Sequence, residues 1–326
     1  MTDEPTIKDV REAAKRIRPF VHRTPILTCG TVNEMCDAEI FFKCENFQKV
    51  GAFKIRGATN AVFSLNREEA TKGVATHSSG NHAAALALAA RWRGTRAYVV
   101  MPENAPQVKK DAVAHYGAEI IFCKPTLEAR EEALAKVVHR TGAAFVHPYN
   151  DHRVISGQGT AALELCEEIT KLDIVMAPVG GGGLLSGTAI AVGALSPKTH
   201  VVAAEPEKAD DAFRSLRAGK IIPANNPRTI ADGLRTSLGD LTFPIIKRRV
   251  KDIVTVSEEG IAVAMRTIWE RMKIIVEPSA AVPLGVLLAR RPEFLGKRIG
   301  VILSGGNVDL AHLPWMGKEL GSRASS

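Results

Sequence analysis

Short apolar runs rich in β-branched residues alternate with amphipathic or alanine-rich segments along most of this 326-residue chain. Such alternation is typical of parallel sheets, in which helices connect successive strands and cover both faces of the sheet. Strands are expected at residues 39–44, 74–76, 97–101, 119–123, 144–146, 173–177, 200–204 and 298–303. Helices are expected between them, for example at residues 81–92, 106–116, 127–139, 159–169 and 258–272. A (β/α)8 barrel would also use this many strands, but their irregular spacing and the long interval from 205 to 254 argue against it.

The strand–helix units are most compact between about residues 74 and 146. We expect this region to form a small domain inserted into a larger one. The predicted boundaries place residues 1–70 and 148–326 in the large domain and residues 71–147 in the small domain. The sequence therefore predicts an α/β protein with two open, twisted, mostly parallel sheets, each with helices on both faces.

The composition narrows the classes of partner. The formal net charge is +8, but the basic residues are scattered, and only three Tyr and three Trp accompany them. This pattern disfavours nucleic acid, whereas an anionic substrate and cofactor suit the charge. Five cysteines without a CxxC pair indicate neither a disulfide framework nor a zinc site. No apolar run reaches the ~18 residues of a membrane span, and the polar N-terminus does not resemble a signal peptide. We expect a cytoplasmic protein with no membrane or nucleic-acid partner.

Lys54 lies between Phe53 and Ile55 in the run VGAFKIRG. Burial among apolar neighbours penalises an ammonium and favours the free amine, which condenses with an aldehyde. Taken alone, the pattern is more typical of an edge strand whose lysine reaches out to solvent.

Residues 180–183 are four consecutive glycines. Because glycine has no Cβ, backbone N–H groups in such a loop can converge on an anion. The run does not match GxGxxG, and it does not match the P-loop, since Thr188 stands where that motif requires lysine. It is therefore a phosphate-binding loop of another type or a structural loop. A lysine for an aldehyde and a loop for a phosphate are together what pyridoxal 5′-phosphate needs.

Three further segments place polar side chains after expected strands. Residues 76–82 (THSSGNH) lead into an alanine-rich helix, whose free N–H groups suit a carboxylate, although a helix cap with two core histidines is also consistent. Residues 304–307 (SGGN) follow the last strong strand, at the end where open α/β sheets bind ligands. Residues 205–211 (EPEKADD) gather carboxylates that suit Mg²⁺ or Ca²⁺, although such clusters are more often solvated helix starts.

The runs AFKIRG, SSGNH, GGGG and SGGN occur in this order, with GQGT at 157–160 and ADG at 231–233 between them. Together they resemble the serine/threonine dehydratase and serine racemase group of fold-type II, tryptophan synthase β-like, pyridoxal-phosphate enzymes. The resemblance covers about residues 5–316. It implies a cofactor in the cleft between the two domains, and a homodimer is usual among such enzymes.

The resemblance also implies residue roles. Lys54 would hold the cofactor aldehyde and later move the substrate Cα proton, and Ser79 would lie on the opposite face. Cofactor contacts are expected from Phe53, Lys54, Asn81, Gly180, Gly181, Gly182, Gly183, Leu184 and Ser304. Substrate contacts are expected from Ser78, Ser79, Asn81, His82 and Arg130. A divalent cation, Mg²⁺ or Ca²⁺, would be bound by Glu205, the carbonyl oxygen of Ala209 and Asp211.

The implied reaction is dehydration of a β-hydroxy amino acid such as L-threonine or L-serine, giving a 2-oxo acid and ammonia. A racemase of serine or aspartate with a dehydratase side activity stays open, because Ser79 supplies a group on the second face. 3-Hydroxyaspartate stays open as a substrate, because Arg130 matches a position that can reach a second carboxylate. A ligand-binding regulatory protein without turnover is a third class, against which the presence of Lys54, Ser79 and Ser304 argues.

Overall fold

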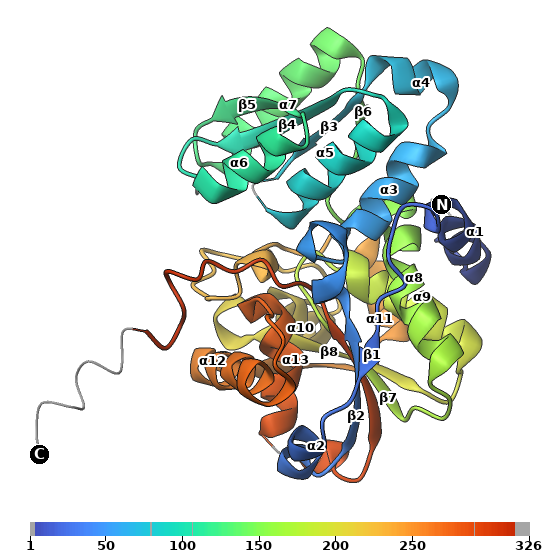
Figure 1. The fold of residues 1–326 in the computed structure, drawn as a ribbon, viewed down its shortest axis with the longest axis vertical. Coiled ribbons are helices and arrows are strands. Elements are labelled where there is room, and N and C mark those ends of the chain that lie inside the picture. The colour runs from blue at the N-terminus through green and yellow to red at the C-terminus, as the bar shows by residue number, and fades with distance from the viewer. Residues whose placement is uncertain (1–3, 79, 106, 290, 317–326) are drawn as a thin grey trace, which may run out of the picture.

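The structure, a computed structural model, describes residues 4–316 apart from residues 79, 106 and 290. Within this part, the chain forms two sheets with helices on both faces, arranged as an upper and a lower lobe in Figure 1. The predicted fold class, α/β with two mostly parallel sheets, is confirmed.

The larger sheet lies in the lower lobe of Figure 1 and has the strand order β1-β2-β10-β7-β8-β9. Its strands are β1 (Ile26–Leu27), β2 (Glu39–Cys44), β7 (Ile174–Pro178), β8 (His200–Pro206), β9 (Asp252–Val256) and β10 (Arg298–Leu303). Neighbours pair in parallel except β1, which runs antiparallel to β2. Nearly every residue of β2, β7 and β10 is buried, as a parallel sheet covered on both faces requires.

Two layers of helices cover the larger sheet. Helices α2 (Gly30–Cys36), α12 (Glu258–Thr267) and α13 (Pro278–Leu288) pack on one face, in a core that includes Val301. Helices α8 (His152–Glu168), α9 (Gly183–Leu195), α10 (Asp211–Ala218) and α11 (Thr242–Arg249) pack on the other, in a core that includes Ile302. Adjacent residues of β10 thus face opposite cores, since side chains alternate along a strand. Helix α1 (Ile7–Ile17) packs against α8 and α3 (Lys54–Ser64).

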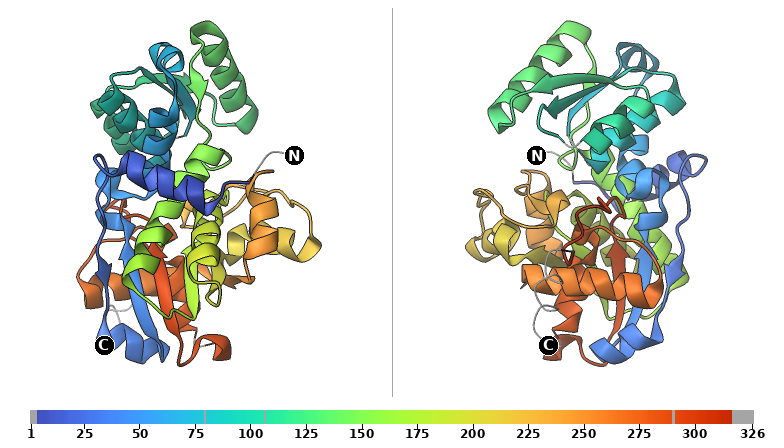
Figure 2. Two further views of the ribbon diagram at one scale, coloured as in Figure 1. Left: turned by 90° about the vertical axis from the view of Figure 1, so that its right-hand side faces the viewer. Right: turned by 60° about the vertical axis from the view of Figure 1, so that its left-hand side comes forward.

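The smaller sheet lies in the upper lobe and has the strand order β5-β4-β3-β6, all parallel. Its strands are β3 (Val74–His77), β4 (Ala97–Pro102), β5 (Glu119–Cys123) and β6 (Ala144–Phe145). Helices α5 (Asn81–Arg93) and α6 (Gln107–His115) pack on one face and α7 (Leu127–Thr141) on the other, as the two views of Figure 2 show. Helix α4 (Arg67–Lys72) leads from α3 into β3.

Four local predictions differ from the structure. Strands β1 and β9 are not predicted. β1 has only two residues, whereas β9 (Asp252–Val256) has β-branched residues at the end of the interval 205–254 and just after it. The helix expected at 159–169 begins at His152, because its glycines are not helix breaks but sites of close packing. A Cβ on Gly157 would lie 2.5 Å from the Cα of Gly57 on α3. The last five residues of the helix expected at 258–272, Ile268–Met272, form a π-helical turn.

No helix in the described residues combines the length and the apolar character needed to cross a lipid bilayer.

Candidate active site

Lys54 is the first residue of α3, so the edge-strand alternative is wrong. The chain before it is held to the end of β10: the N–H of Phe53 donates to the carbonyl oxygen of Ser304 (3.0 Å), and Ala52 pairs with Gly305 in a β-bridge. The Lys54 Nζ donates to the carbonyl oxygen of Pro148 (2.8 Å) and lies 5.1 Å from the centre of the Phe53 ring. Although part of the side chain is accessible, the amine is surrounded by protein, and desolvation lowers the pKa of Lys54 to about 8.

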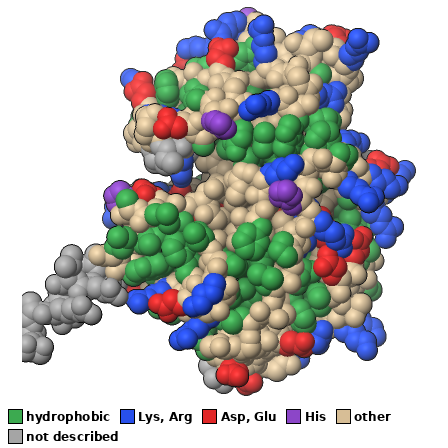
Figure 3. All heavy atoms as spheres, in the orientation of Figure 1, with side chains coloured by type: hydrophobic (Ala, Val, Ile, Leu, Met, Phe, Trp, Pro, Cys, Tyr) green, Lys and Arg blue, Asp and Glu red, His purple; other side chains and the backbone are tan. Residues whose placement is uncertain are grey.

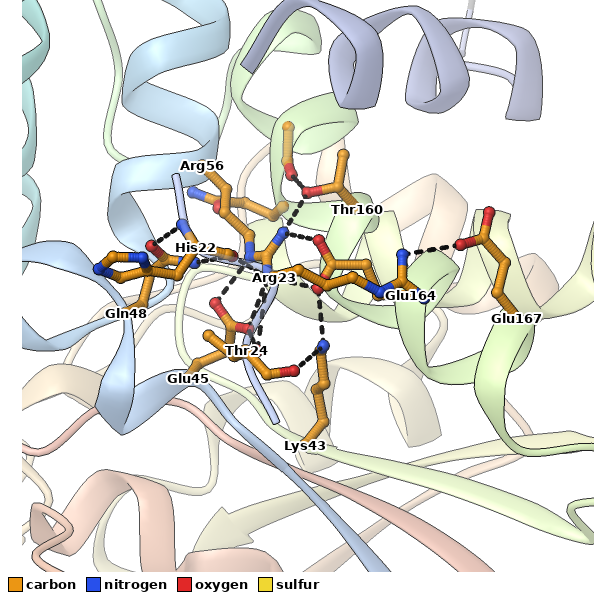
Figure 4. Close-up of polar contacts among 12 residues, drawn as sticks. His22, Arg23, Thr24, Lys43, Glu45, Gln48, Arg56, Thr160, Glu164 and Glu167 are labelled. Carbon is orange, nitrogen blue, oxygen red and sulfur yellow. Dashed lines mark hydrogen bonds and ion pairs between the residues drawn. The ribbon is translucent and has the colours of Figure 1, made fainter. Parts of the chain in front are cut away.

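A buried ionic network fixes the first turn of α3, as Figure 4 shows. Arg56, two residues after Lys54, is completely buried and donates to Glu45 (2.7 Å) and Glu164 (2.7 Å). The Lys43 Nζ lies 2.6 Å from Glu164 as well. Because a buried charge without its partner is strongly destabilising, the network holds the start of α3 to β2 and α8.

The glycine run forms the turn between β7 and α9. Gly182 has φ of +90°, which favours glycine, and precedes the first residue of α9. A Cβ on Gly181 would lie 2.3 Å from the ring of Tyr149, and one on Gly182 would lie 2.8 Å from Thr242. The N–H groups at the start of the 13-residue helix point toward this turn and suit a phosphate. Gly180, Gly183 and Leu184 complete the segment.

Ser304 and Asn81 lie at two further strand-to-helix or strand-to-loop junctions. Ser304 follows β10 and is buried, and Asn81 is the first residue of α5. The Asn81 Nδ2 donates to both carboxylate oxygens of Glu277 (3.1 and 3.2 Å), and its Oδ1 accepts from the Asn307 Nδ2 (3.0 Å). Lys54, Asn81 and Ser304 are therefore brought together where strands of both sheets end. Figure 3 shows the surface indented between the two lobes.

Glu277 is not predicted from the sequence, and Asn307 is predicted only as part of the SGGN run. Glu277 precedes the helix α13 and is only 5% exposed. Burial raises the pKa of Glu277 to about 7, although hydrogen bonding from Asn81 opposes the shift. A lone glutamate before Pro278 is an ordinary helix start in a sequence, so no local signal distinguishes it.

The segment before α5 holds the expected substrate contacts. The N–H of Ser78 donates to the carbonyl oxygen of Val100, and its Oγ accepts from the N–H of Gly80. Ser79 lies outside the described residues. His82 is completely buried, 3.3 Å from the Val146 carbonyl oxygen, and burial moves its pKa well below the ordinary value, so the ring is neutral. Its position is that of a core histidine.

Arg130 lies in the first turn of α7, where its Nε donates to the Thr126 carbonyl oxygen (3.2 Å). Burial and the positive charge of Arg130 both lower the pKa of His77, the last residue of β3. Since His77 directly precedes the 78–82 segment, Arg130 places a positive charge beside the end of the small sheet.

The expected cation ligands lie at the end of β8. Glu205 and Asp211 are both 1% exposed, and Ala209 lies in the short turn between them. Glu205 accepts from the N–H groups of Ala212 (2.9 Å) and Phe213 (2.8 Å). Neither oxygen of Asp211 has a hydrogen bond of normal geometry. Burial raises the pKa of Glu205 to about 9 and that of Asp211 to about 7.

Two buried carboxylates, one of them without a hydrogen bond of normal geometry, fit a hard divalent cation completed by a backbone carbonyl oxygen. No cluster of three or more His, Cys, Asp or Glu side chains suited to a metal occurs in the described part of the chain. On the face shown in Figure 3, Lys and Arg side chains are dispersed rather than gathered into one basic surface.

The described residues also fit pyridoxal phosphate. The amine of Lys54 has a pKa suited to an aldehyde, the turn before α9 suits its phosphate, and the buried hydroxyl of Ser304 suits a ring nitrogen.

Comparison with known proteins identifies close relatives. The family described as "Pyridoxal-phosphate dependent enzyme" matches residues 17–305. The beta-hydroxyaspartate dehydratase of Paracoccus denitrificans is 55% identical, over 95% of this chain and 99% of that protein. The solved structure of serine racemase from Dictyostelium discoideum is 52% identical with a TM-score of 0.90, and the match covers 94% of this chain and 99% of that one. The solved structure of the T.th. threonine deaminase is 46% identical with a TM-score of 0.89, over the same shares of the two chains.

Proposed function

Because this chain belongs to the family of pyridoxal-phosphate-dependent enzymes, we propose that it dehydrates β-hydroxy amino acids, with 3-hydroxyaspartate as its main substrate. The substrate would lose its Cα proton and its β-hydroxyl as water. Hydrolysis would then release ammonia and leave a 2-oxo acid. L-Serine and L-threonine, which the sequence suggests first, would be alternative substrates.

When bound, pyridoxal phosphate supplies an electron sink for the electron pair left at Cα. Lys54 would anchor the cofactor and take the Cα proton at Nζ once the substrate amine has replaced it. A pKa near 8 leaves part of the Lys54 amine neutral at physiological pH, as a general base needs. The turn at 180–184 would bind the phosphate, Asn81 would contact the ring oxygen, and the Ser304 hydroxyl would face the ring nitrogen without adding a charge.

Arg130 is the observation that carries the choice of substrate. It places a guanidinium close enough to His77 to lower that residue's pKa, beside the segment expected to bind the substrate. A guanidinium can pair with a carboxylate in a two-pronged contact, and 3-hydroxyaspartate offers a second carboxylate that serine and threonine lack. The similarity to a beta-hydroxyaspartate dehydratase supports the same choice.

Racemisation of serine is the second candidate, because a serine racemase is similar over almost the whole chain. Racemisation needs a proton donor on the face opposite Lys54. The resemblance assigns that role to Ser79, outside the described residues.

A substrate panel tests the proposal. The holoenzyme would be assayed with the 3-hydroxyaspartate stereoisomers, L- and D-serine and L-threonine, and both the 2-oxo acid and the enantiomer of the remaining amino acid would be measured. Arg130→Gln is expected to lower kcat/KM for 3-hydroxyaspartate by roughly tenfold or more, as for a lost charged hydrogen bond, and to spare L-serine. Arg140→Gln is the matched control, because Arg140 is an exposed arginine of the same helix, paired with Glu119. Equal loss for both substrates in Arg130→Gln would remove the argument for a second carboxylate.

The domain boundaries, the assembly and the metal are proposed as well. We propose a large domain of residues 1–70 and 148–326, a small domain of residues 71–147, a homodimer and a cytoplasmic location. We also propose Mg²⁺ or Ca²⁺ at Glu205, Ala209 and Asp211.

A further inference from the structure

The side-chain amide of Asn81 is held on both sides by residues of the other lobe. Its Oδ1 accepts from the Asn307 Nδ2 (3.0 Å), and its Nδ2 donates to the Glu277 carboxylate (3.1 and 3.2 Å). Asn307 is itself oriented, because its Nδ2 also donates to the carbonyl oxygen of Val50 (2.7 Å). A reversed Asn81 amide would set its oxygen against a carboxylate and its NH₂ against another NH₂. The network therefore permits one orientation of Asn81.

The backbone makes room for both partners of Asn81. A Cβ on Gly305 would lie 2.7 Å from the Glu277 Oε1, and a Cβ on Gly51 would lie 2.4 Å from the Asn307 Oδ1. The N–H of Glu277 also donates to the carbonyl oxygen of Gly305 (3.0 Å). Gly305, beside Ser304, thus leaves space for Glu277, and Gly51, near Lys54, leaves space for Asn307. The sequence pattern does not indicate this role.

Glu277 also interacts electrostatically with Lys54. Its carboxylate raises the pKa of Lys54 against the larger, lowering effect of burial. The charged groups that act on Glu277 include Asp232, which raises the pKa of Glu277, and Lys109 of the upper lobe, which lowers it. Lys109 and Asp232 form an ion pair of 2.6 Å between the lobes.

We propose that Glu277 is a positioning residue of the cofactor site, which acts by fixing the amide of Asn81. The proposal rests on the proposed use of Asn81 to contact the ring oxygen of pyridoxal phosphate. One Nδ2 hydrogen of Asn81 is used by Glu277, and the second remains for that anionic ring oxygen. In its ionised form the carboxylate polarises this donor and excludes the reversed amide, which would present an oxygen to an oxygen.

The test compares Glu277→Gln with the wild-type holoenzyme at full length. A glutamine has nearly the same shape but can donate as well as accept, so it no longer enforces the orientation of Asn81. The dissociation constant of pyridoxal phosphate is expected to rise roughly tenfold, as for one charge-assisted hydrogen bond. The pH midpoint of the visible absorption band of the bound cofactor is expected to shift, because a charge beside Lys54 and Asn81 is removed. Neither quantity depends on turnover.

Glu258→Gln is the matched control. Its carboxylate is partly buried and accepts a backbone N–H, that of Ile230 (2.7 Å), but it lies on α12 and this hydrogen bond does not involve Asn81 or Lys54. Both variants are expected to lower the melting temperature, and only Glu277→Gln to change the cofactor constant and the absorption. If Glu277→Gln lowers only the melting temperature, as the control does, Glu277 has a purely structural role and the proposal is wrong.

If Glu277→Gln does not fold, Asn307→Ser provides a second test of whether the orientation of Asn81 affects cofactor binding. It removes the donor to Asn81 and is expected to weaken cofactor binding in the same direction; wild-type binding and absorption in this variant would overturn the proposal. A wild-type protein that binds no pyridoxal phosphate would instead refute the proposed function, together with this inference. A wild type that binds it normally, with variants that do so equally well, would refute this inference alone.

Discussion

The Lys54 amine donates a hydrogen bond of 2.8 Å to the carbonyl oxygen of Pro148, which joins the start of α3 to the segment between β6 and α8. This contact directs the amine toward the junction of the two lobes, where β3, β7 and β10 all end. It also places the amine where desolvation outweighs the field of Glu277.

The pH dependence of cofactor uptake follows from this placement. The folded-state pKa of Lys54, about 8, lies below the value of 10.5 for a free lysine. Below pH 8 the ammonium form of Lys54 dominates, and it cannot attack an aldehyde. Above pH 8 the neutral amine dominates, and it can attack. Apoprotein mixed with pyridoxal phosphate is expected to gain its visible absorption faster as the pH rises, with a midpoint near 8.

Borohydride should fix the bound cofactor on the Lys54 peptide, and Lys54→Ala should lose the visible absorption band and nearly all turnover. Labelling of a different lysine would contradict the assignment.

Arg56 and Arg23 provide a matched pair for stability, and both appear in Figure 4. Arg56→Gln leaves the buried Glu45 without its charged partner and leaves Glu164 paired with Lys43 alone. It is expected to lower the free energy of unfolding by about 3–5 kcal/mol. Arg23 is half-exposed and pairs with Glu167 and Glu168 at the surface. Arg23→Gln is therefore expected to cost at most about 1 kcal/mol. Urea unfolding of both variants measures the difference, and similar losses would show that the network around Arg56 contributes little.

The cation proposal is tested by stripping divalent metal. Glu205 and Asp211 bury two carboxylates close together, so a bound cation relieves both their repulsion and their desolvation. Adding Mg²⁺ or Ca²⁺ at about 100 times its dissociation constant after EDTA treatment is expected to raise the melting temperature by roughly 5 °C. Asp211→Asn should abolish the response, and Glu207→Gln, an exposed neighbour, should retain it. An unchanged melting temperature in the wild type would favour a site without metal.

Ser79→Ala separates racemisation from dehydration. If Lys54 takes the Cα proton of an L-substrate, elimination can proceed without Ser79, whereas racemisation needs a proton from the other face. The variant is expected to lose conversion of L- to D-serine and most elimination from D-serine, while it retains dehydration of L-substrates. Chiral chromatography and the 2-oxo acid assay measure these three rates. Their equal loss would mean that Ser79 mainly positions the substrate.

The sequence alone determined the class of fold and the chemical types at the site. The alternation of apolar runs and helical segments is a local property, and it matches the strands β2, β5 and β10 to the residue. The glycine run likewise indicates a loop whose backbone N–H groups can approach an anion, because the lack of a Cβ is a property of each residue by itself. Predictions that depended on weak local signals were wrong. Strand β1 is too short to give a pattern, and Gly157 and Gly159 obscure the start of helix α8.

Tertiary structure decided which of these groups meet. Asn81 and Glu277 are 196 positions apart, and they touch only because parallel strands of two sheets end at the same junction. Glu277 has no sequence signal, since an acidic residue before a helix is ordinarily a solvated cap; its burial, its partner and its effect on Lys54 come from the packing of α13 beside β10. Local sequence fixes the period and the backbone freedom of each segment, whereas the desolvation and pairing of a charge depend on neighbours that only the folded chain supplies.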